Sequence, residues 1–158
     1  MKFKLRLIED SDLPFLKSVY RSTRETELNL TGWTEEEKTK FIDFQFNAQH
    51  THYINSYKGA LFNIIEWNKK EVGRLYLWET DEQIRIMDIT ILSEYRGQGI
   101  GTSILNHLIE DSEKSGKKLN IHVEHNNPAL GLYERMGFKK TDDTGIYYFM
   151  ERLPKIRT

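Results

Sequence analysis

The sequence contains no cysteine. This absence excludes a disulfide framework, a zinc site built from thiolates and a cysteine nucleophile. The sequence also has no apolar run long enough to cross a membrane, and residues 1–6 lack the apolar core of a signal peptide. We therefore expect a cytoplasmic protein that does not act at a membrane.

A large excess of charge of either sign is missing as well. The 23 lysine and arginine residues nearly balance 24 aspartate and glutamate residues, which leaves a net charge of −1. Such a balance creates no global field that would attract nucleic acid, so an anion site in this chain must be local. There is no internal repeat or flexible linker, and 158 residues suffice for one core. We predict a single domain over residues 1–158.

The most informative stretch runs from residue 84 to residue 116. Residues 84–92 are dense in β-branched and apolar side chains, which is typical of a buried strand. After a glycine-rich turn at residues 96–101, apolar residues recur at helical spacing as far as Ile109, and Gly116 offers a stop. The pattern predicts a strand, a tight turn and a helix that begins at or just after Gly99.

A turn of this kind can hold an anion. The first N–H groups of a helix have no partners within the helix and carry partial positive charge, and glycines keep side chains away from them. The spacing is not that of a nucleotide P-loop, which needs a lysine after Gly101. A dinucleotide fingerprint also fails, because it needs glycine at Thr102 or Ile104. What remains is the spacing [Q/R]-x-x-G-x-[G/A], matched by Arg96, Gly99 and Gly101.

A second block follows at residues 126–138, where asparagines and Pro128 favour the start of a short helix and Gly137 favours its end. Together the two blocks resemble the GNAT superfamily of acetyl-coenzyme A dependent N-acetyltransferases. In that family the first block is the pyrophosphate-binding turn, and the second reads approximately N-x-x-A-x-x-[LF]-Y-x-x-x-G-F. Its fixed positions are matched by Asn126, Ala129, Leu132, Tyr133, Gly137 and Phe138. The resemblance covers the second half of the chain well and the first half only in its order of elements.

The remaining segments carry strand and helix signals in turn. Helices are predicted over residues 11–23 and from a capping box at residues 34–37, with residues 25–32 as a turn. Strand patterns occupy residues 2–7, 60–67, 72–78, 119–123, 138–141 and 146–150. In the first of them, Phe3, Leu5 and Leu7 alternate with charged residues, as in a strand with one buried face.

With the resemblance, these segments imply an α/β (α+β) fold. We expect a GNAT-like mixed, mostly antiparallel sheet of six to seven strands with about four flanking helices. The strands at residues 84–92 and 119–123 should form a parallel, splayed pair, because a helix connects them.

The resemblance implies acetyl-coenzyme A (acetyl-CoA) as the donor substrate and no metal. Its pantetheine arm would lie between the parallel strands, where the N–H of Thr90 or Ile91 would face the thioester carbonyl. The residues expected to bind the donor are Ile89, Thr90, Ile91, Leu92, Arg96, Gly97, Gln98, Gly99, Ile100, Gly101, Thr102 and Asn126. A further set either meets the phosphates or forms a solvated basic surface: Lys117, Lys118, Arg135, Lys139 and Lys140.

Two residues are expected to carry the chemistry. Tyr133 is the candidate general acid, because a phenol holds its proton near neutral pH and can pass it to a departing thiolate; otherwise it only packs a helix on the sheet. Asp88 could take the proton that an amine loses before attack, or instead bond a turn or a neighbouring strand. His122, Glu124 and His125 should not form a metal site, because on a strand residues 122 and 124 share one face and residue 125 points away from it.

Acceptor contacts are expected from Trp33, Phe44 and Tyr53, in a helical region that flanks the acceptor site in the GNAT fold. Alternatively these aromatic side chains pack on the sheet. The expected activity is direct transfer of an acetyl group to a primary amine of a small molecule or peptide that the sequence does not identify. The alternatives are a non-catalytic acyl-CoA sensor and an enzyme for a different acyl group. The chain could also form a homodimer.

Overall fold

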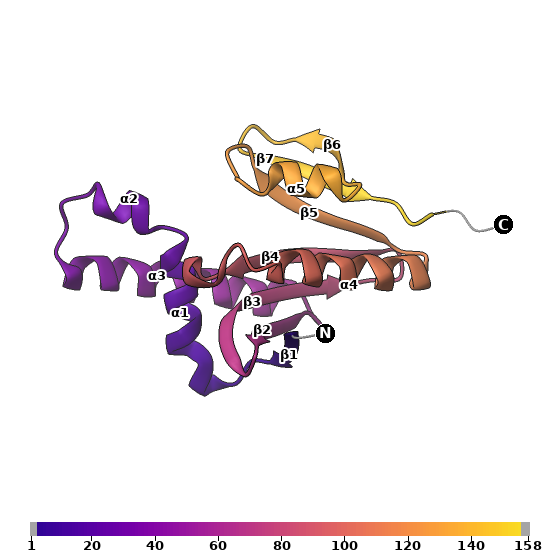
Figure 1. The fold of residues 1–158 in the computed structure, drawn as a ribbon. Coiled ribbons are helices and arrows are strands. Elements are labelled where there is room, and N and C mark those ends of the chain that lie inside the picture. The colour runs from indigo at the N-terminus through magenta and orange to yellow at the C-terminus, as the bar shows by residue number, and fades with distance from the viewer. Residues whose placement is uncertain (1–2, 156–158) are drawn as a thin grey trace.

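The structure is a computed structural model, and it describes residues 3–155. Its centre is a seven-stranded sheet in the order β1-β2-β3-β4-β5-β7-β6 (Figure 1). The strands are β1 (Phe3–Leu7), β2 (Leu61–Trp67), β3 (Lys70–Glu79), β4 (Gln83–Ile91), β5 (Lys118–Glu124), β6 (Lys139–Asp143) and β7 (Tyr147–Arg152). Neighbouring strands are antiparallel except β4 and β5, which are parallel. The predicted fold class is confirmed.

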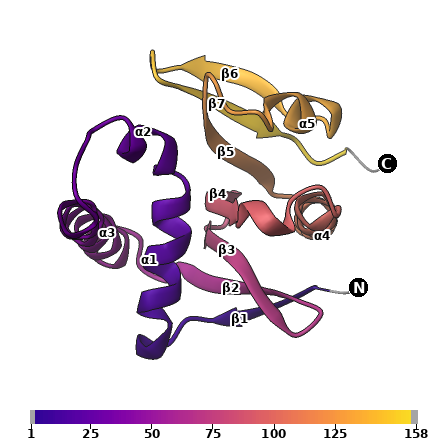
Figure 2. The same cartoon turned by 60° about the vertical axis from the view of Figure 1, so that its left-hand side comes forward.

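Helices cover both faces of this sheet (Figure 2). They are α1 (Leu13–Ser22), α2 (Glu25–Asn29), α3 (Glu35–Ser56), α4 (Ile100–Ser115) and α5 (Leu130–Arg135). Helices α1 and α3 pack on one face, and α4 and α5 pack on the other. The count exceeds the expected four because the segment predicted as a turn contains the short helix α2. No helix within residues 3–155 is both long and apolar enough to span a membrane.

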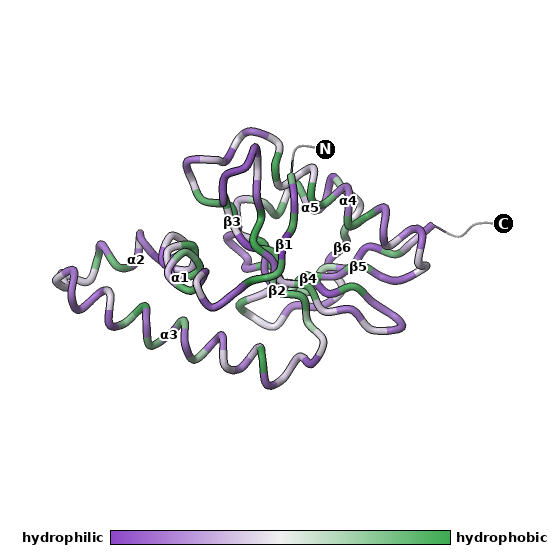
Figure 3. Tube along the Cα trace, turned by 90° about the horizontal axis from the view of Figure 1, so that it is seen from below, coloured by the Kyte–Doolittle hydropathy of each residue, from purple (hydrophilic) through white to green (hydrophobic). Residues whose placement is uncertain are grey.

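The predicted capping box begins α3. The Thr34 hydroxyl accepts a hydrogen bond from the Glu37 N–H at 3.2 Å, and the Glu37 side chain accepts one from the Thr34 N–H at 3.1 Å. Phe46 is buried against the sheet, as the packing interpretation expects, whereas Phe44 is 74% exposed. The two residues are two positions apart on α3 and so point to different faces of the helix: Phe46 faces the sheet and Phe44 faces away from it. Figure 3 shows that α2 and the first half of α3 reach beyond the sheet.

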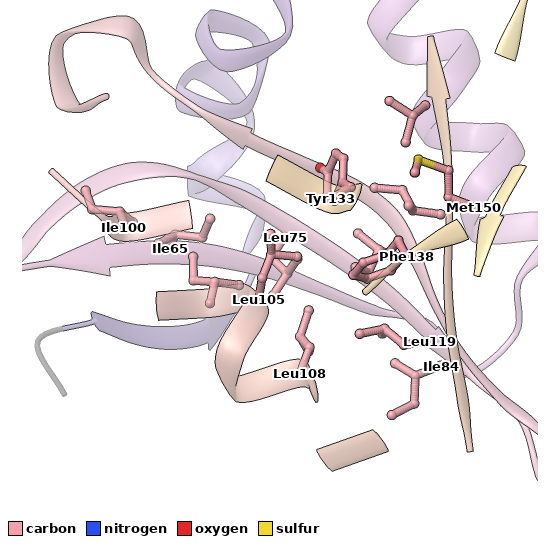
Figure 4. Packing of buried hydrophobic residues seen from close by; sticks show 14 of the residues in the cluster. Ile65, Leu75, Ile84, Ile100, Leu105, Leu108, Leu119, Tyr133, Phe138 and Met150 are labelled. Atoms are coloured by element: carbon pink, nitrogen blue, oxygen red, sulfur yellow. The ribbon is translucent and has the colours of Figure 1, made fainter. Parts of the chain in front are cut away.

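Two hydrophobic clusters hold the layers together. The larger lies between the sheet and helices α4 and α5 and includes Leu105, Leu108, Tyr133 and Phe138 (Figure 4). The smaller lies under α1 and α3. The alternation in β1 predicted one buried face, but Leu7 is 59% exposed. That prediction was wrong at Leu7 because β1 is an edge strand, and alternation shows which residues share a face but not whether a helix covers it.

Strands β3 and β4 approach closely at Gly73, which pairs with Ile91. A Cβ atom at Gly73 would overlap the backbone carbonyl oxygen of Thr90, so a side chain there must push the strands apart. We expect Gly73→Ala to lower the free energy of unfolding by about 1–3 kcal/mol, measured by urea denaturation. Gly131→Ala in α5 is the control, since its Cβ would meet only the flexible end of Arg135. Equal stability of the two variants would contradict the argument.

Candidate active site

Strands β4 and β5 part at the middle of the sheet. Their parallel pairing begins at Gln83 opposite Lys118 and its last pair is Ile86 with Ile121. Just beyond, Met87 is an extra residue in β4, because Tyr76 of β3 pairs with Asp88 while Leu77 pairs with Ile86. Such a bulge bends a strand and re-aims its side chains. The second half of β4 therefore presents a backbone edge that β5 does not pair.

The hydrogen-bond alternation of β4 shows which of its backbone groups face β5. The Leu92 N–H donates to the Val72 carbonyl at 2.8 Å, so Leu92 and Thr90 bond toward β3. The intervening residues, Ile89 and Ile91, direct their N–H and carbonyl groups toward β5. Of the two amides that the sequence proposed for the thioester carbonyl, the geometry therefore favours Ile91 over Thr90.

The glycine turn follows directly. Gly97 and Gly99 have φ values of 79° and 80°, in the left-handed region that favours glycine. Gly99 is the N-cap of α4, and the Ser103 N–H donates to its carbonyl at 3.0 Å. The N–H groups of residues 100–102 come before that first helical bond. A Cβ atom on Gly97, Gly99 or Gly101 would meet nothing within 4 Å, so the described chain leaves open space at the turn.

Arg96 ties the turn to the strand. Its Nε donates to the Ile91 carbonyl oxygen at 3.0 Å, which holds the end of β4 against the turn. The basic residues whose role the sequence left open include Lys117, which lies past the C-terminal end of α4 and bonds Glu79 at 2.6 Å. Lys140 lies 4.1 Å from the ring centre of Tyr148. Lys117 is thus at the opposite end of α4 from the glycine turn.

Tyr133 lies on α5 and is only 5% exposed. Its ring meets that of Phe138 edge to face at 5.6 Å within the larger cluster. Burial, and to a lesser degree the negative charge of Asp88, raises the pKa of Tyr133 to about 12. The phenol therefore keeps its proton at neutral pH.

Asn126 lies in the turn between β5 and α5 and is exposed. The sequence suggested that Pro128 lies in the first turn of the helix. Helix α5 begins at Leu130, so Pro128 lies before it. Asn127 makes the local bond here, accepting from the Ala129 N–H at 2.8 Å.

Asp88 forms an ion pair with Arg74 of the neighbouring strand β3. The Thr90 hydroxyl donates to its other carboxylate oxygen at 2.7 Å. Burial first and the Asp88 charge second raise the pKa of Tyr53 of α3 to about 12. Tyr53 packs edge to face on Tyr76 at 6.0 Å, and Tyr76 pairs with Asp88, so Tyr53 lies on the Asp88 side of the sheet. Tyr133 belongs to the cluster on the other side, under α4 and α5.

The other two aromatic candidates lie elsewhere. Trp33 is 38% exposed and packs edge to face at 5.1 Å on Phe41 of α3. Phe44 is exposed on α3. Of the three predicted acceptor contacts, only Tyr53 packs on a residue that pairs with Asp88, namely Tyr76.

His122 was considered in the sequence only as a metal ligand, and the structure gives it another setting. Its strand neighbours Ile121 and Val123 are buried on the α4 side, so His122 points to the opposite face, the face on which Asp88 lies. Burial, together with the charge of Arg85, lowers the pKa of His122, which favours a neutral imidazole. The alternation of β5 could have revealed this face. Within residues 3–155, no group of three or more His, Asp or Glu side chains could hold a metal.

Comparisons with known proteins agree with this geometry. Residues 58–140 match the model of the acetyltransferase (GNAT) domain. The chain is 33% identical over 119 residues to the probable N-acetyltransferase san of Drosophila melanogaster, which covers 70% of this chain and 65% of that relative, less than two thirds. It is 28% identical over 118 residues to the putative [ribosomal protein bS18]-alanine N-acetyltransferase of Bacillus subtilis, covering 73% of this chain and 70% of the relative.

A solved structure shows the same fold. The PaiA N-acetyltransferase of Thermoplasma acidophilum in complex with coenzyme A superposes with a TM-score of 0.71, at 21% sequence identity. The superposition covers 97% of this chain and 99% of that chain.

Proposed function

Because the chain belongs to the acetyltransferase (GNAT) domain family, we propose that it transfers an acetyl group from acetyl-CoA to a primary amine by direct attack of the amine on the thioester. One observation carries the proposal: the unpaired edge of β4 runs straight into a left-handed glycine turn that opens a helix, with a buried, protonated tyrosine beside it. A strand edge, an anion site and a proton donor are what this reaction needs of a protein.

The donor would be held in two places. Its pyrophosphate would accept hydrogen bonds from the N–H groups of residues 100–102, with Arg96 and residues 97–99 shaping the turn. Its pantetheine arm would pair with the backbone of Ile89 and Ile91, as a missing strand would, in the stretch that ends at Leu92. Asn126 would approach it from the β5 side.

Two groups would act on the thioester. The Ile91 N–H would stabilise the oxyanion of the tetrahedral intermediate, and Tyr133 would face the departing sulfur. Proton transfer from a phenol with a pKa of about 12 to a thiolate whose acid has a pKa near 8.5 is uphill by roughly 5 kcal/mol. We therefore assign to Tyr133 a hydrogen bond that strengthens as charge develops on sulfur, with transfer completed late.

The acceptor must lose a proton before it attacks, and Asp88 is the residue proposed to receive it. This step also favours the one that follows. Because the Asp88 charge helps to raise the pKa of Tyr133, protonation of Asp88 removes that contribution and makes the phenol a stronger acid as the sulfur leaves. His122, with its lowered pKa on the same face, is the second candidate for this proton.

The class of acceptor is proposed from a relative. The Bacillus subtilis protein is named for an alanine of ribosomal protein bS18, and alanine has only its α-amine to acetylate. We therefore propose a peptide α-amine as the acceptor. Tyr53 would contact it on the Asp88 side of the sheet, while the exposed Phe44 of α3 and Trp33 just before α3 would contact residues further along the peptide.

A panel of amines tests the function. Purified protein is mixed with acetyl-CoA and with peptides that carry a free α-amine, the same peptides with a blocked N-terminus, a polyamine or lysine, and coenzyme A release is followed above the rate without acceptor. We expect release with the free peptides and none with their blocked forms. Release only with the polyamine would overturn the acceptor class.

The same panel distinguishes an acetyltransferase from a non-catalytic acyl-CoA sensor. Saturable binding of coenzyme A in calorimetry without transfer to any amine would favour a non-catalytic acyl-CoA-binding module. Absence of binding would overturn both. Propionyl-CoA run beside acetyl-CoA tests the alternative of a different acyl group.

A further inference from the structure

Arg74 of β3 is a charged side chain in the interior, with only 2% of its surface exposed. A buried charge is costly unless it is paired and hydrogen-bonded. Arg74 forms an ion pair with Asp88, and its Nη2 also donates to Gln49 Oε1 of α3 at 3.1 Å. The rings of Tyr76 and Tyr20 lie 4.7 and 5.7 Å from the guanidinium carbon. The guanidinium is thus held between aromatic rings and directed at a single carboxylate.

Part of the Arg74 guanidinium has no hydrogen-bond partner in the described part of the chain, and a gain in stability does not explain why it is buried. The Nε and Nη1 atoms of Arg74 are buried without a hydrogen-bond partner among residues 3–155, as are the Tyr76 hydroxyl and His50 Nδ1. Replacing a buried ion pair with apolar side chains is often neutral or stabilising, and unsatisfied donors add to its cost. A charge kept in such a place points to a role for the pair in the site.

The place of Asp88 indicates that role. Asp88 follows the bulge at which β4 parts from β5, and both of its carboxylate oxygens are held, one by Arg74 and the other by the Thr90 hydroxyl. Arg74 in turn pairs in register with Thr90, so the three side chains share one face of the two strands. The carboxylate is therefore fixed from the β3 side at the beginning of the parted segment.

We propose that Arg74 is a positioning residue for Asp88: it fixes the carboxylate at the parted strands, where the proposed acceptor amine would meet it. The inference rests on the proposed function. The step it serves is the transfer of one proton, in which an N–H bond of the acceptor ammonium breaks, an O–H bond forms on Asp88 and the amine keeps the electron pair for its attack. Arg74 itself touches neither substrate.

The groups around the pair leave Arg74 as its cation. From α3, Tyr53 packs edge to face on Tyr76 of β3 at 6.0 Å, and Tyr76 pairs in register with Asp88. Burial and then the Arg74 charge lower the pKa of His50 on the same helix. Among residues 3–155, Asp88 forms a salt bridge with Arg74 alone. Arg74 is therefore the charged group that holds Asp88 in place.

The test compares kcat, the KM for the acceptor and the Kd for coenzyme A in variants of the full chain. Arg74→Met keeps a similar length but removes the group that holds one Asp88 oxygen, so the carboxylate should lose its fixed position. We expect kcat to fall about tenfold or more. Arg74→Lys can still donate to the carboxylate and should recover most of the lost kcat. The Kd for coenzyme A should not change in either variant.

A second measurement covers the case in which Arg74→Met folds poorly. The double variant Arg74→Met with Asp88→Asn leaves no unpaired charge and should recover thermal stability relative to Arg74→Met alone. Equal loss of kcat in Arg74→Met and Arg74→Lys, or a loss of coenzyme A binding that parallels the loss of kcat, would show that Arg74 is merely structural. Wild-type protein that transfers no acetyl group would overturn the proposed function itself, whereas an active wild type with unchanged kcat in Arg74→Met overturns only this inference.

Discussion

Tyr133→Phe should lower turnover by about 100-fold or more while the Kd for coenzyme A changes by less than about twofold. The substitution removes one hydroxyl and keeps the ring that packs on Phe138 inside the larger cluster. What is lost is the hydroxyl that would donate a hydrogen bond to the departing sulfur. That hydrogen bond matters in the transition state and little in the binding of coenzyme A. Steady-state kinetics with a saturating peptide acceptor, combined with calorimetry of coenzyme A, measures the two quantities separately.

The pH profile supplies an internal check on this role. Because burial, and secondarily Asp88, raises the pKa of Tyr133 to about 12, the phenol stays protonated throughout the neutral range. Wild-type kcat should therefore show no alkaline decline from Tyr133 until about pH 11. Tyr148→Phe, which removes a half-buried phenol stacked on His125, is the matched control and should leave turnover unchanged. Equal turnover in Tyr133→Phe and wild type would remove Tyr133 from the mechanism.

Gly101→Glu should weaken coenzyme A binding by about 100-fold or more, which corresponds to roughly 2.8 kcal/mol. Gly101 is the second residue of α4, its φ is not left-handed, and a Cβ atom there would meet nothing within 4 Å. A carboxylate in the first turn of a helix favours the helix, so the fold should tolerate the change. The same carboxylate would occupy and repel the site proposed for the pyrophosphate. Calorimetry with coenzyme A gives the Kd directly.

The control for this substitution lies at the other end of the same helix. Gly116 has a φ of 71° and caps the C-terminus of α4, so Gly116→Ala strains the helix end without approaching the turn. It should lower thermal stability and leave the Kd unchanged. Gly99→Glu is a poorer test, because Gly99 also has a left-handed φ and a loss of binding could come from strain in the turn. Unimpaired binding by a folded Gly101→Glu variant would place the pyrophosphate elsewhere.

Features that depend on residues close together along the chain could be predicted from the sequence. Gly99 and Gly116 were predicted to bound a helix, and α4 indeed runs between them, since a left-handed turn or cap is a property of the residue that adopts it. The box from Thr34 to Glu37 began α3 for the same reason. The turn, the helix after it and the parallel pairing of β4 with β5 followed from local chemistry and a short connection.

The sequence could not indicate what depends on which strands and helices become neighbours. Alternation grouped Phe3, Leu5 and Leu7 but could not show that Leu7 would remain exposed on an edge strand. The aromatic spacing of α3 did not show which residues would face the sheet, and Phe44 faces away from it. The position of β7 between β5 and β6 likewise follows from the packing of the whole sheet.

By itself, the sequence determined the kind of site: a strand, a glycine turn and a tyrosine block whose conformations are set within a few residues. Only the tertiary structure decided how the charges in that site are arranged. Arg74 and Asp88 belong to different strands, and their ion pair exists because β3 pairs with β4 in one register while β4 leaves β5. Burial then decides which groups keep a proton, and burial is a property of the packed molecule rather than of any residue.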